Sequence, residues 1–187
     1  MAESTAVWSS MVLIITLGLT GSSFSGVSGA SHRSSEPKSA VSSSSSEQEI
    51  RGEVEQFRQA ILHMDMKGVT RYYWNSPDLV VFDVIPPLSY VGWESFRKDW
   101  EGFFDGFKQI TVYDWSDIHI EVEGNLGWMR ALVHMLGTLK DGKPLDMTFR
   151  DTAIFERKDG KWVVVHDHGS VPILFETGQA VMNAPPK

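Results

Sequence analysis

The chain has 187 residues, 42% of them hydrophobic and 11% aromatic, and a formal net charge of −7. This size and apolar content fit a single globular domain with a substantial core. An acidic chain without a basic stripe argues against nucleic acid and anionic membrane surfaces as partners. Because there is no cysteine, disulfides, thiolate zinc sites and cysteine nucleophiles are excluded.

The first residues have the pattern of an export signal. Residues 11–20 form an apolar run that is too short to span a bilayer, and small residues follow up to a candidate cleavage point after Ala30. No Lys or Arg precedes the run, which leaves an uncleaved anchor or a disordered leader as alternatives. We predict a signal peptide over residues 1–30, and therefore a secreted or periplasmic protein without membrane contact after cleavage. The serine-rich residues 31–46 are predicted to be a disordered linker.

Helical periodicity begins at Glu47. Apolar residues recur at spacings of three and four from Ile50 onward, which predicts an amphipathic helix that runs through His63. A short second helix is expected over residues 67–74, and it ends there because Pro77 disfavours a helical residue before it. Residues 93–104 are expected to form a third helix with aromatic side chains on its inner side.

Strand patterns occupy most of the remaining chain. Residues 79–83 indicate a buried strand that ends in Asp83, followed by a rigid Pro-Pro turn. Turn signals then separate four longer strands, expected over residues 110–122, 126–139, 145–157 and 162–173. Because the helices come first in the chain and a curved antiparallel meander follows, we predict an α+β fold in which three helices close over one face of the sheet. One domain is expected over residues 47–177, with a tail over residues 178–187.

Two Asp-Gly turns set the expected register of the last three strands. A two-residue turn at the second of them places Asp151 opposite His168, with His166 on the same face. A two-residue turn at the first places Arg130 and His134 on that face as well, because strand side chains alternate. Ionisable groups embedded in an otherwise apolar face suggest the lining of a pocket rather than a plain core.

The order of these elements resembles the SnoaL-like branch of the nuclear transport factor 2 superfamily. The resemblance covers about Glu47 to Thr177 and rests chiefly on the strand ending in Asp83, the Asp-Gly-Lys-Trp turn at residues 159–162, and the His-x-His-x-Ser strand at residues 166–170. It implies a cone-shaped α+β barrel with a deep apolar pocket for a small ligand, needing neither a metal nor another cofactor. It also implies a homodimer formed through the outer face of the sheet.

Ketosteroid isomerases and polyketide cyclases of this fold have an acid at the position of Asp83, where it moves a proton next to a carbonyl. The isomerase also keeps a second, protonated acid in its apolar site, and Asp151 lies at a similar place on the sheet. Its tyrosine on the first helix has no counterpart, because Gln59 falls near that position.

The association domain of calcium/calmodulin-dependent kinase II is also similar, since it shares Thr152, the Asp-Gly-Lys-Trp turn and the His-x-His-x-Ser strand. That resemblance implies oligomer assembly and binding of small carboxylates. His134 stands where this relative has an arginine facing the pocket.

Each candidate site residue has a functional and a structural interpretation. Asp83 is either a proton-transfer base, with a pKa raised by desolvation, or a strand-end carboxylate that accepts backbone hydrogen bonds in the turn. Asp151 and His168 form either an acid/base pair or a buried hydrogen-bond anchor. His166 and His168 could share a metal ion, but the aromatic neighbours and the metal-free relatives argue against it.

Three aromatic residues are candidates for the pocket walls, because in this fold the third helix and its preceding loop form the mouth of the cone. They are Tyr90, Trp100 and Trp115. The Gly-Asn turn at residues 124–125 places Trp115 opposite His134, unless a bulge shifts the long strand. Two other tryptophans are expected in the core: Trp128 and Trp162.

Two functions follow from these interpretations. In the first, an exported homodimer binds a small, mostly apolar ligand that carries a carbonyl or a carboxylate, and Asp83 moves a proton while Asp151 with His168 or His134 polarises the oxygen. The reaction would be an isomerase, cyclase or dehydratase type, and the ligand contacts would come from Tyr90, Trp100, Trp115, Arg130, His134 and His166. In the second, the domain is a non-catalytic binding or assembly module with a structural His-x-His strand.

Overall fold

The computed structural model describes residues 45–184, so the predicted signal peptide and nearly all of the predicted linker lie outside the described residues. Three helices precede or interrupt the strands: α1 (Ser45–Leu62), α2 (Met66–Tyr72) and α3 (Trp93–Gly106). The six strands are β1 (Val80–Phe82), β2 (Tyr90–Val91), β3 (Phe107–Glu123), β4 (Leu126–Leu139), β5 (Pro144–Lys158) and β6 (Lys161–Ser170). None of the helices in this part of the chain is both long enough and apolar enough to cross a membrane.

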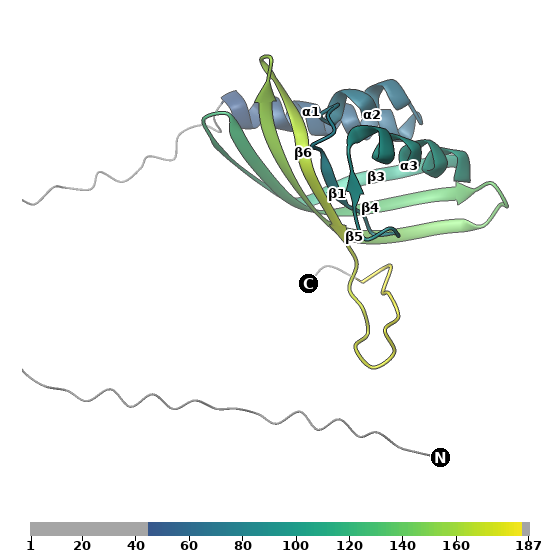
Figure 1. Ribbon diagram of the computed structural model, residues 1–187. Coiled ribbons are helices and arrows are strands. Elements are labelled where there is room, and N and C mark those ends of the chain that lie inside the picture. The colour runs from purple at the N-terminus through teal and green to yellow at the C-terminus, as the bar shows by residue number, and fades with distance from the viewer. Residues whose placement is uncertain (1–44, 185–187) are drawn as a thin grey trace, which may run out of the picture. The chain divides into compact units, whose positions relative to one another are not determined.

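The strands form one strongly curved sheet in the order β2-β1-β6-β5-β4-β3, and the three helices lie across its concave side (Figure 1). The predicted α+β cone is confirmed. The sheet is mixed rather than wholly antiparallel, because β1 pairs in parallel with β6. A parallel pair needs a long connection, and the whole of the chain between β1 and β6 supplies it.

The helices begin and end where local chemistry requires. Five residues of α1 at helical spacing are buried against the sheet: Ile50, Val54, Phe57, Ala60 and Ile61. Met64 then adopts a positive φ of 52°, and Asp65 caps α2 by accepting a hydrogen bond from the backbone N–H of Lys67 at 2.9 Å. This tight turn brings α2 back against α1 and so stacks Tyr72 on Phe57, with ring centroids 3.9 Å apart.

The turn between β5 and β6 follows the prediction, but the strand beyond it does not. Both turn residues have positive φ angles, 50° and 79°, as a tight Asp-Gly turn requires. Farther along, Val165 is an extra residue in β6, and the pairing shifts by one position. His168 therefore pairs with Thr152 instead of Asp151, so the predicted register was wrong. Because side chains alternate, Asp167 rather than His168 shares the inner face with Asp151.

The turn between β4 and β5 is one residue longer than predicted. The backbone N–H of Leu139 donates to the carbonyl of Lys143, which closes a three-residue loop in which Gly142 has a φ of 87°. The expected two-residue register was therefore wrong as well. Arg130 and His134 pair with threonines of β5 and lie on the outer face of the sheet, the face away from the helices.

A third irregularity occurs in β3. Asp117 has a φ of 53°, and the pairing with β4 shifts there by one residue. Trp115 consequently faces Val133 rather than His134, and its ring lies on the inner side of the sheet. Trp162 is buried as predicted, whereas the prediction for Trp128 was wrong, because it is 37% exposed on the outer face.

The close contact between α1 and α2 gives a matched pair of glycine variants. A Cβ at Gly68 would lie 2.3 Å from Cβ of Ala60, whereas a Cβ at Gly52, on the exposed side of α1, would meet nothing within 4 Å. Gly68→Ala should therefore lower the free energy of unfolding by about 1–3 kcal/mol through overpacking. Gly52→Ala should raise it by about 0.5–1 kcal/mol through helix propensity. Urea unfolding monitored by circular dichroism measures both, and a destabilising Gly52→Ala would contradict this account.

Candidate functional site

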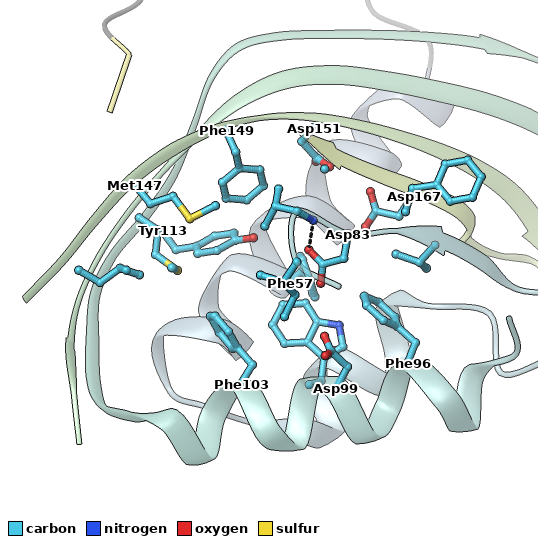
Figure 2. Close-up of a pocket in the computed structure, with 18 of the residues that line it drawn as sticks. Phe57, Asp83, Phe96, Asp99, Phe103, Tyr113, Met147, Phe149, Asp151 and Asp167 are labelled. Atoms are coloured by element: carbon cyan, nitrogen blue, oxygen red, sulfur yellow. Dashed lines mark hydrogen bonds between the residues drawn. The ribbon is translucent and has the colours of Figure 1, made fainter. Parts of the chain in front are cut away.

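The helices and the inner face of the sheet enclose a cavity of about 300 Å³ (Figure 2). Eleven of its 24 lining residues are aromatic and four are aspartates, while none is a lysine, arginine or histidine. A cavity of this volume can hold a ligand of one or two rings. The four acids are Asp83, Asp99, Asp151 and Asp167.

Asp83 directly follows β1 and points into the cavity, as Val81 does two residues earlier. Its Oδ1 accepts a hydrogen bond from the backbone N–H of Val84 at 2.5 Å, drawn in Figure 2. Burial raises the pKa of Asp83 to about 7, and the charges of Asp99 and Asp167 act in the same direction, while the Val84 hydrogen bond opposes them. This carboxyl group can therefore gain or lose a proton near neutral pH.

Asp99 approaches Asp83 from helix α3. Its Oδ1 accepts a hydrogen bond from the hydroxyl of Tyr90 at 2.6 Å. Burial and this hydrogen bond both raise the pKa of the Tyr90 hydroxyl, which stays a donor. Tyr90 was predicted to line the pocket, but it does not belong to the cavity wall and instead holds Asp99 in place.

Asp151 and Asp167 form a second pair of acids. They come from β5 and β6 and are diagonal neighbours on the inner face, because Asp167 pairs with Ala153. The hydroxyl of Tyr73 donates to Asp167 Oδ2 at 2.6 Å, and Trp115 Nε1 donates to Asp151 Oδ2 at 3.3 Å. Figure 2 shows both carboxyl groups at the sheet side of the cavity.

The surroundings of Asp151 favour the neutral form of its carboxyl group. Burial raises its pKa well above the usual range, and the neighbouring Asp167 adds to the shift. Asp167 Oδ1 is buried and has no hydrogen-bond partner among the described residues. A proton on Asp151 supplies the donor that this oxygen lacks, which fits the general rule that buried polar atoms are paired.

Tyr113, from β3, offers a hydrogen-bond donor to the cavity. Its hydroxyl points into the cavity in Figure 2, and it bonds to no other side chain or backbone group within residues 45–184. Burial raises the pKa of this hydroxyl well above its usual range, followed by the charge of Asp151. Tyr113 therefore stays protonated and can donate to an oxygen of a bound ligand.

The structure brings four of the predicted site residues together and separates the rest. The four on the cavity wall are Asp83, Trp100, Trp115 and Asp151. The expectation that four more of them share this face was wrong, because the bulge at Val165 and the three-residue turn move them to the outer face: Arg130, His134, His166 and His168.

On the outer face these side chains have ordinary surface partners. Arg130 binds the carboxylate of Asp117 at 3.1 Å, and His134 lies 3.1 Å from a carboxylate oxygen of Asp146. Nδ1 of His166 is 2.9 Å from a backbone carbonyl oxygen of β1. Within residues 45–184, no group of three histidine, cysteine or acidic residues is arranged to hold a metal ion.

Sequence reasoning missed several groups that the cavity brings together. Asp99 could have been found, because it lies three residues after Phe96 and four before Phe103, on the aromatic face of α3. Asp167 was hidden by the bulge, because regular alternation from the Asp-Gly turn would place it on the outer face. Tyr113 gave no signal beyond a strand alternation that fits any inward-facing aromatic residue.

The described part of the predicted tail also contributes to the cavity. The backbone N–H of Thr148 donates to the carbonyl of Met182 at 2.5 Å, and Met182 is one of the lining residues. A second backbone hydrogen bond, from Val181 to Pro172, folds the segment back on itself. The chain after β6 therefore closes part of the cavity.

Residues 50–174 match the family of SnoaL-like domains. The chain belongs to the SnoaL-like family. A nuclear transport factor 2-like protein of unknown function from Pseudomonas putida is 26% identical, with a TM-score of 0.68 over 76% of this chain and 97% of that one. No curated protein matches this SnoaL-like chain.

Two more distant structures share the fold alone. One from Xanthomonas campestris, provisionally named a calcium/calmodulin-dependent protein kinase II association domain, is 19% identical with a TM-score of 0.58. The alignment covers 66% of this chain and 86% of that one. The other, from Novosphingobium aromaticivorans and provisionally named a scytalone dehydratase, is 14% identical with a TM-score of 0.62 over 76% and 93% of the two chains.

The raised pKa of Asp83 predicts how stability depends on pH. Between about pH 4, where an unfolded aspartate loses its proton, and about pH 7, the folded chain holds a proton that the unfolded chain has lost. The free energy of unfolding should therefore fall as pH rises through this window. Asp83→Asn should remove this part of the slope and make the variant more stable than the wild type above pH 7, by about 1–3 kcal/mol.

Urea unfolding at pH 5 and pH 8 measures the effect. Asp105→Asn is the control, because Asp105 is on the same helix as Asp99 but its side chain is 87% exposed. The control should follow the wild-type pH dependence. An Asp83→Asn curve parallel to the wild type would contradict the burial argument.

Proposed function

We propose that this SnoaL-like protein binds a small, mostly apolar ligand with a carbonyl group and moves a proton on the carbon next to it. The observation that carries the proposal is Asp83, whose pKa of about 7 suits it to proton transfer and which opens onto an aromatic cavity. The hydroxyl of Tyr113 supplies the complementary donor in the same cavity.

The chemistry needs one base and one donor. The Asp83 carboxylate takes a proton from the carbon next to the carbonyl, and negative charge develops on the carbonyl oxygen. The Tyr113 hydroxyl donates a hydrogen bond to that oxygen, where a preorganised donor in a water-poor site is most effective. Protonated Asp83 then returns the proton to another carbon, which gives an isomerisation, or to a leaving hydroxyl group, which gives a dehydration.

The polar lining favours a carbonyl over a carboxylate in the ligand. Four aspartates line the cavity with no lysine, arginine or histidine among them, and a carboxylate would add an unpaired buried charge beside them. Arg130, His134 and His166, which were expected to contact the ligand, lie on the outer face. The dehydratase name of the relative from N. aromaticivorans concerns that protein, and the likeness at 14% identity supports the fold.

Proton exchange on a simple ketone tests the reaction without a known substrate. β-Tetralone is a two-ring ketone of suitable size, and proton NMR in deuterated buffer follows the loss of its hydrogens next to the carbonyl. Asp83→Asn should lower the catalysed exchange rate at least about 100-fold, because the base is lost. Tyr113→Phe should lower it by roughly 10- to 1,000-fold, because the oxygen loses its donor.

His168→Asn is the matched control, since this histidine is exposed on the outer face. It should keep the exchange rate within about twofold. Equal loss of exchange in all three variants would point to a structural effect. Tight binding of a panel of cyclic and aryl ketones without catalysed exchange would overturn the proposal in favour of a non-catalytic binding module.

We also propose that the protein forms a homodimer through the outer face of its sheet. Trp128 lies on this face and is 37% exposed, and exposed aromatic side chains are typical of protein interfaces. Trp128→Glu should place a charge in the contact and raise the monomer fraction at least about tenfold at micromolar concentration. Sedimentation velocity measures this fraction, and a wild type that is monomeric would contradict the proposal.

A further inference from the structure

The cavity holds more negative charge than its surroundings balance. Its lining has four carboxyl groups and no cationic side chain, whereas buried charges in proteins are normally paired. The hydrogen bonds to these carboxyl groups come from neutral donors: the Val84 N–H, the Trp115 indole, and the hydroxyls of Tyr73 and Tyr90. A neutral donor orients a carboxylate but leaves its charge uncompensated.

Protons relieve only part of this charge. The acids form two pairs, Asp83 with Asp99 and Asp151 with Asp167, and burial makes Asp83 and Asp151 hold their protons with a raised pKa. Asp99 and Asp167 each accept a hydrogen bond from a tyrosine hydroxyl at 2.6 Å. Even with one proton shared within each pair, no cationic side chain of the lining balances the remaining carboxyl groups.

The surrounding walls suit an organic cation. Eleven aromatic side chains line the cavity, and the faces of aromatic rings attract ammonium groups, most strongly where water is excluded. Figure 2 shows Asp99 on α3 between Phe96 and Phe103, so its carboxylate lies among rings. A metal ion is a poor alternative, since no set of three ligands within residues 45–184 is arranged to hold one.

We propose that the ligand of this cavity carries a protonated amine, whose ammonium group binds Asp99 among the aromatic rings of α3 while a ligand oxygen accepts from Tyr113. The inference rests on the proposed function, because it names the ligand class of the same site as an aromatic or alicyclic amino ketone or amino alcohol. The ammonium supplies the positive charge that the lining lacks. The oxygen satisfies the Tyr113 hydroxyl, a nine-tenths-buried residue without a partner in the described part of the chain.

Three ligands with the same ring and different charge test the class. Tryptamine, tryptophol and indole acetate carry an ammonium, a hydroxyl and a carboxylate on one indole framework. In isothermal titration calorimetry at pH 7.5, tryptamine should bind at least about tenfold more tightly than tryptophol. Indole acetate should show no measurable binding. Equal affinities for amine and alcohol, or preference for the carboxylate, would overturn the inference.

Proton release gives a second readout on the wild-type protein. Asp83 is faced by Asp99 from α3, Asp167 from β6, Asp151 from β5 and Tyr113 from β3. Below about pH 7 Asp83 holds a proton that a nearby ammonium would expel. The affinity for tryptamine should therefore rise with pH, by up to about tenfold per unit, with protons released into the buffer. Tryptophol should release none.

The double variant Asp83→Asn with Asp99→Asn removes the charge of this pair while keeping its shape. It should bind tryptamine no more tightly than tryptophol, and its tryptophol affinity should stay within about twofold of the wild type. Asp105→Asn, exposed on the same helix, should keep the full amine preference. Should the double variant fail to fold, the ligand ranking and the proton release of the wild type still decide the question.

The two proposals fail in different ways. If the protein catalyses proton exchange on a ketone but does not bind the amine more tightly than the alcohol, the inference is overturned and the proton-transfer function remains supported. If the protein binds the amine more tightly than the alcohol but catalyses proton exchange on no ketone, the ligand class is supported and the proposed proton-transfer function is overturned.

Discussion

The extra residue in β6, Val165, decides which side chains face the cavity. If Val165 paired regularly with Ile154 instead of forming a bulge, the tight Asp-Gly turn would set one uninterrupted register, and the two histidines of β6 would point inward. The bulge moves the alternation by one position. Asp167 therefore lies beside Asp151 inside, and the histidines lie outside. The acidic character of the cavity, and with it both the proton chemistry and the expected charge of the ligand, depends on this single residue.

The two pairs of acids connect different elements of the fold. Asp83 and Asp99 join the end of β1 to helix α3, whereas Asp151 and Asp167 join two neighbouring strands. Each pair has one member that accepts a hydrogen bond from a tyrosine hydroxyl at 2.6 Å, while burial raises the pKa of the other member. Such buried acids destabilise the folded chain at neutral pH, and the aromatic packing around Phe57 and Tyr72 offsets that cost. Sites that destabilise the folded chain are common where function requires buried charges without partners.

The sequence was sufficient to predict the fold but not to predict which side chains of each strand face the cavity. Helical periodicity located α1 and α3 to within a few residues, and the strand ending in Asp83 was expected from its apolar run and the following prolines. The registers were wrong for a specific reason: a turn longer by one residue, or one bulged residue, leaves the strand pattern intact and inverts every side chain beyond it. Arg130, His134, His166 and His168 were misplaced in this way. Asp99 was overlooked although its spacing from Phe96 and Phe103 placed it on the inner face of α3.

The charge of the ligand and the acidity of Asp83 are coupled. An ammonium bound at Asp99 would lower the pKa of Asp83, because a nearby positive charge favours the ionised carboxylate. The base would then be present in the bound state at a pH where the empty cavity still holds its proton. A neutral ketone brings no such charge and meets an Asp83 that is only half ionised near pH 7. The same uncompensated charge that selects an amine would thus also activate the base, so that recognition of the ligand and readiness for proton transfer arise from one electrostatic imbalance.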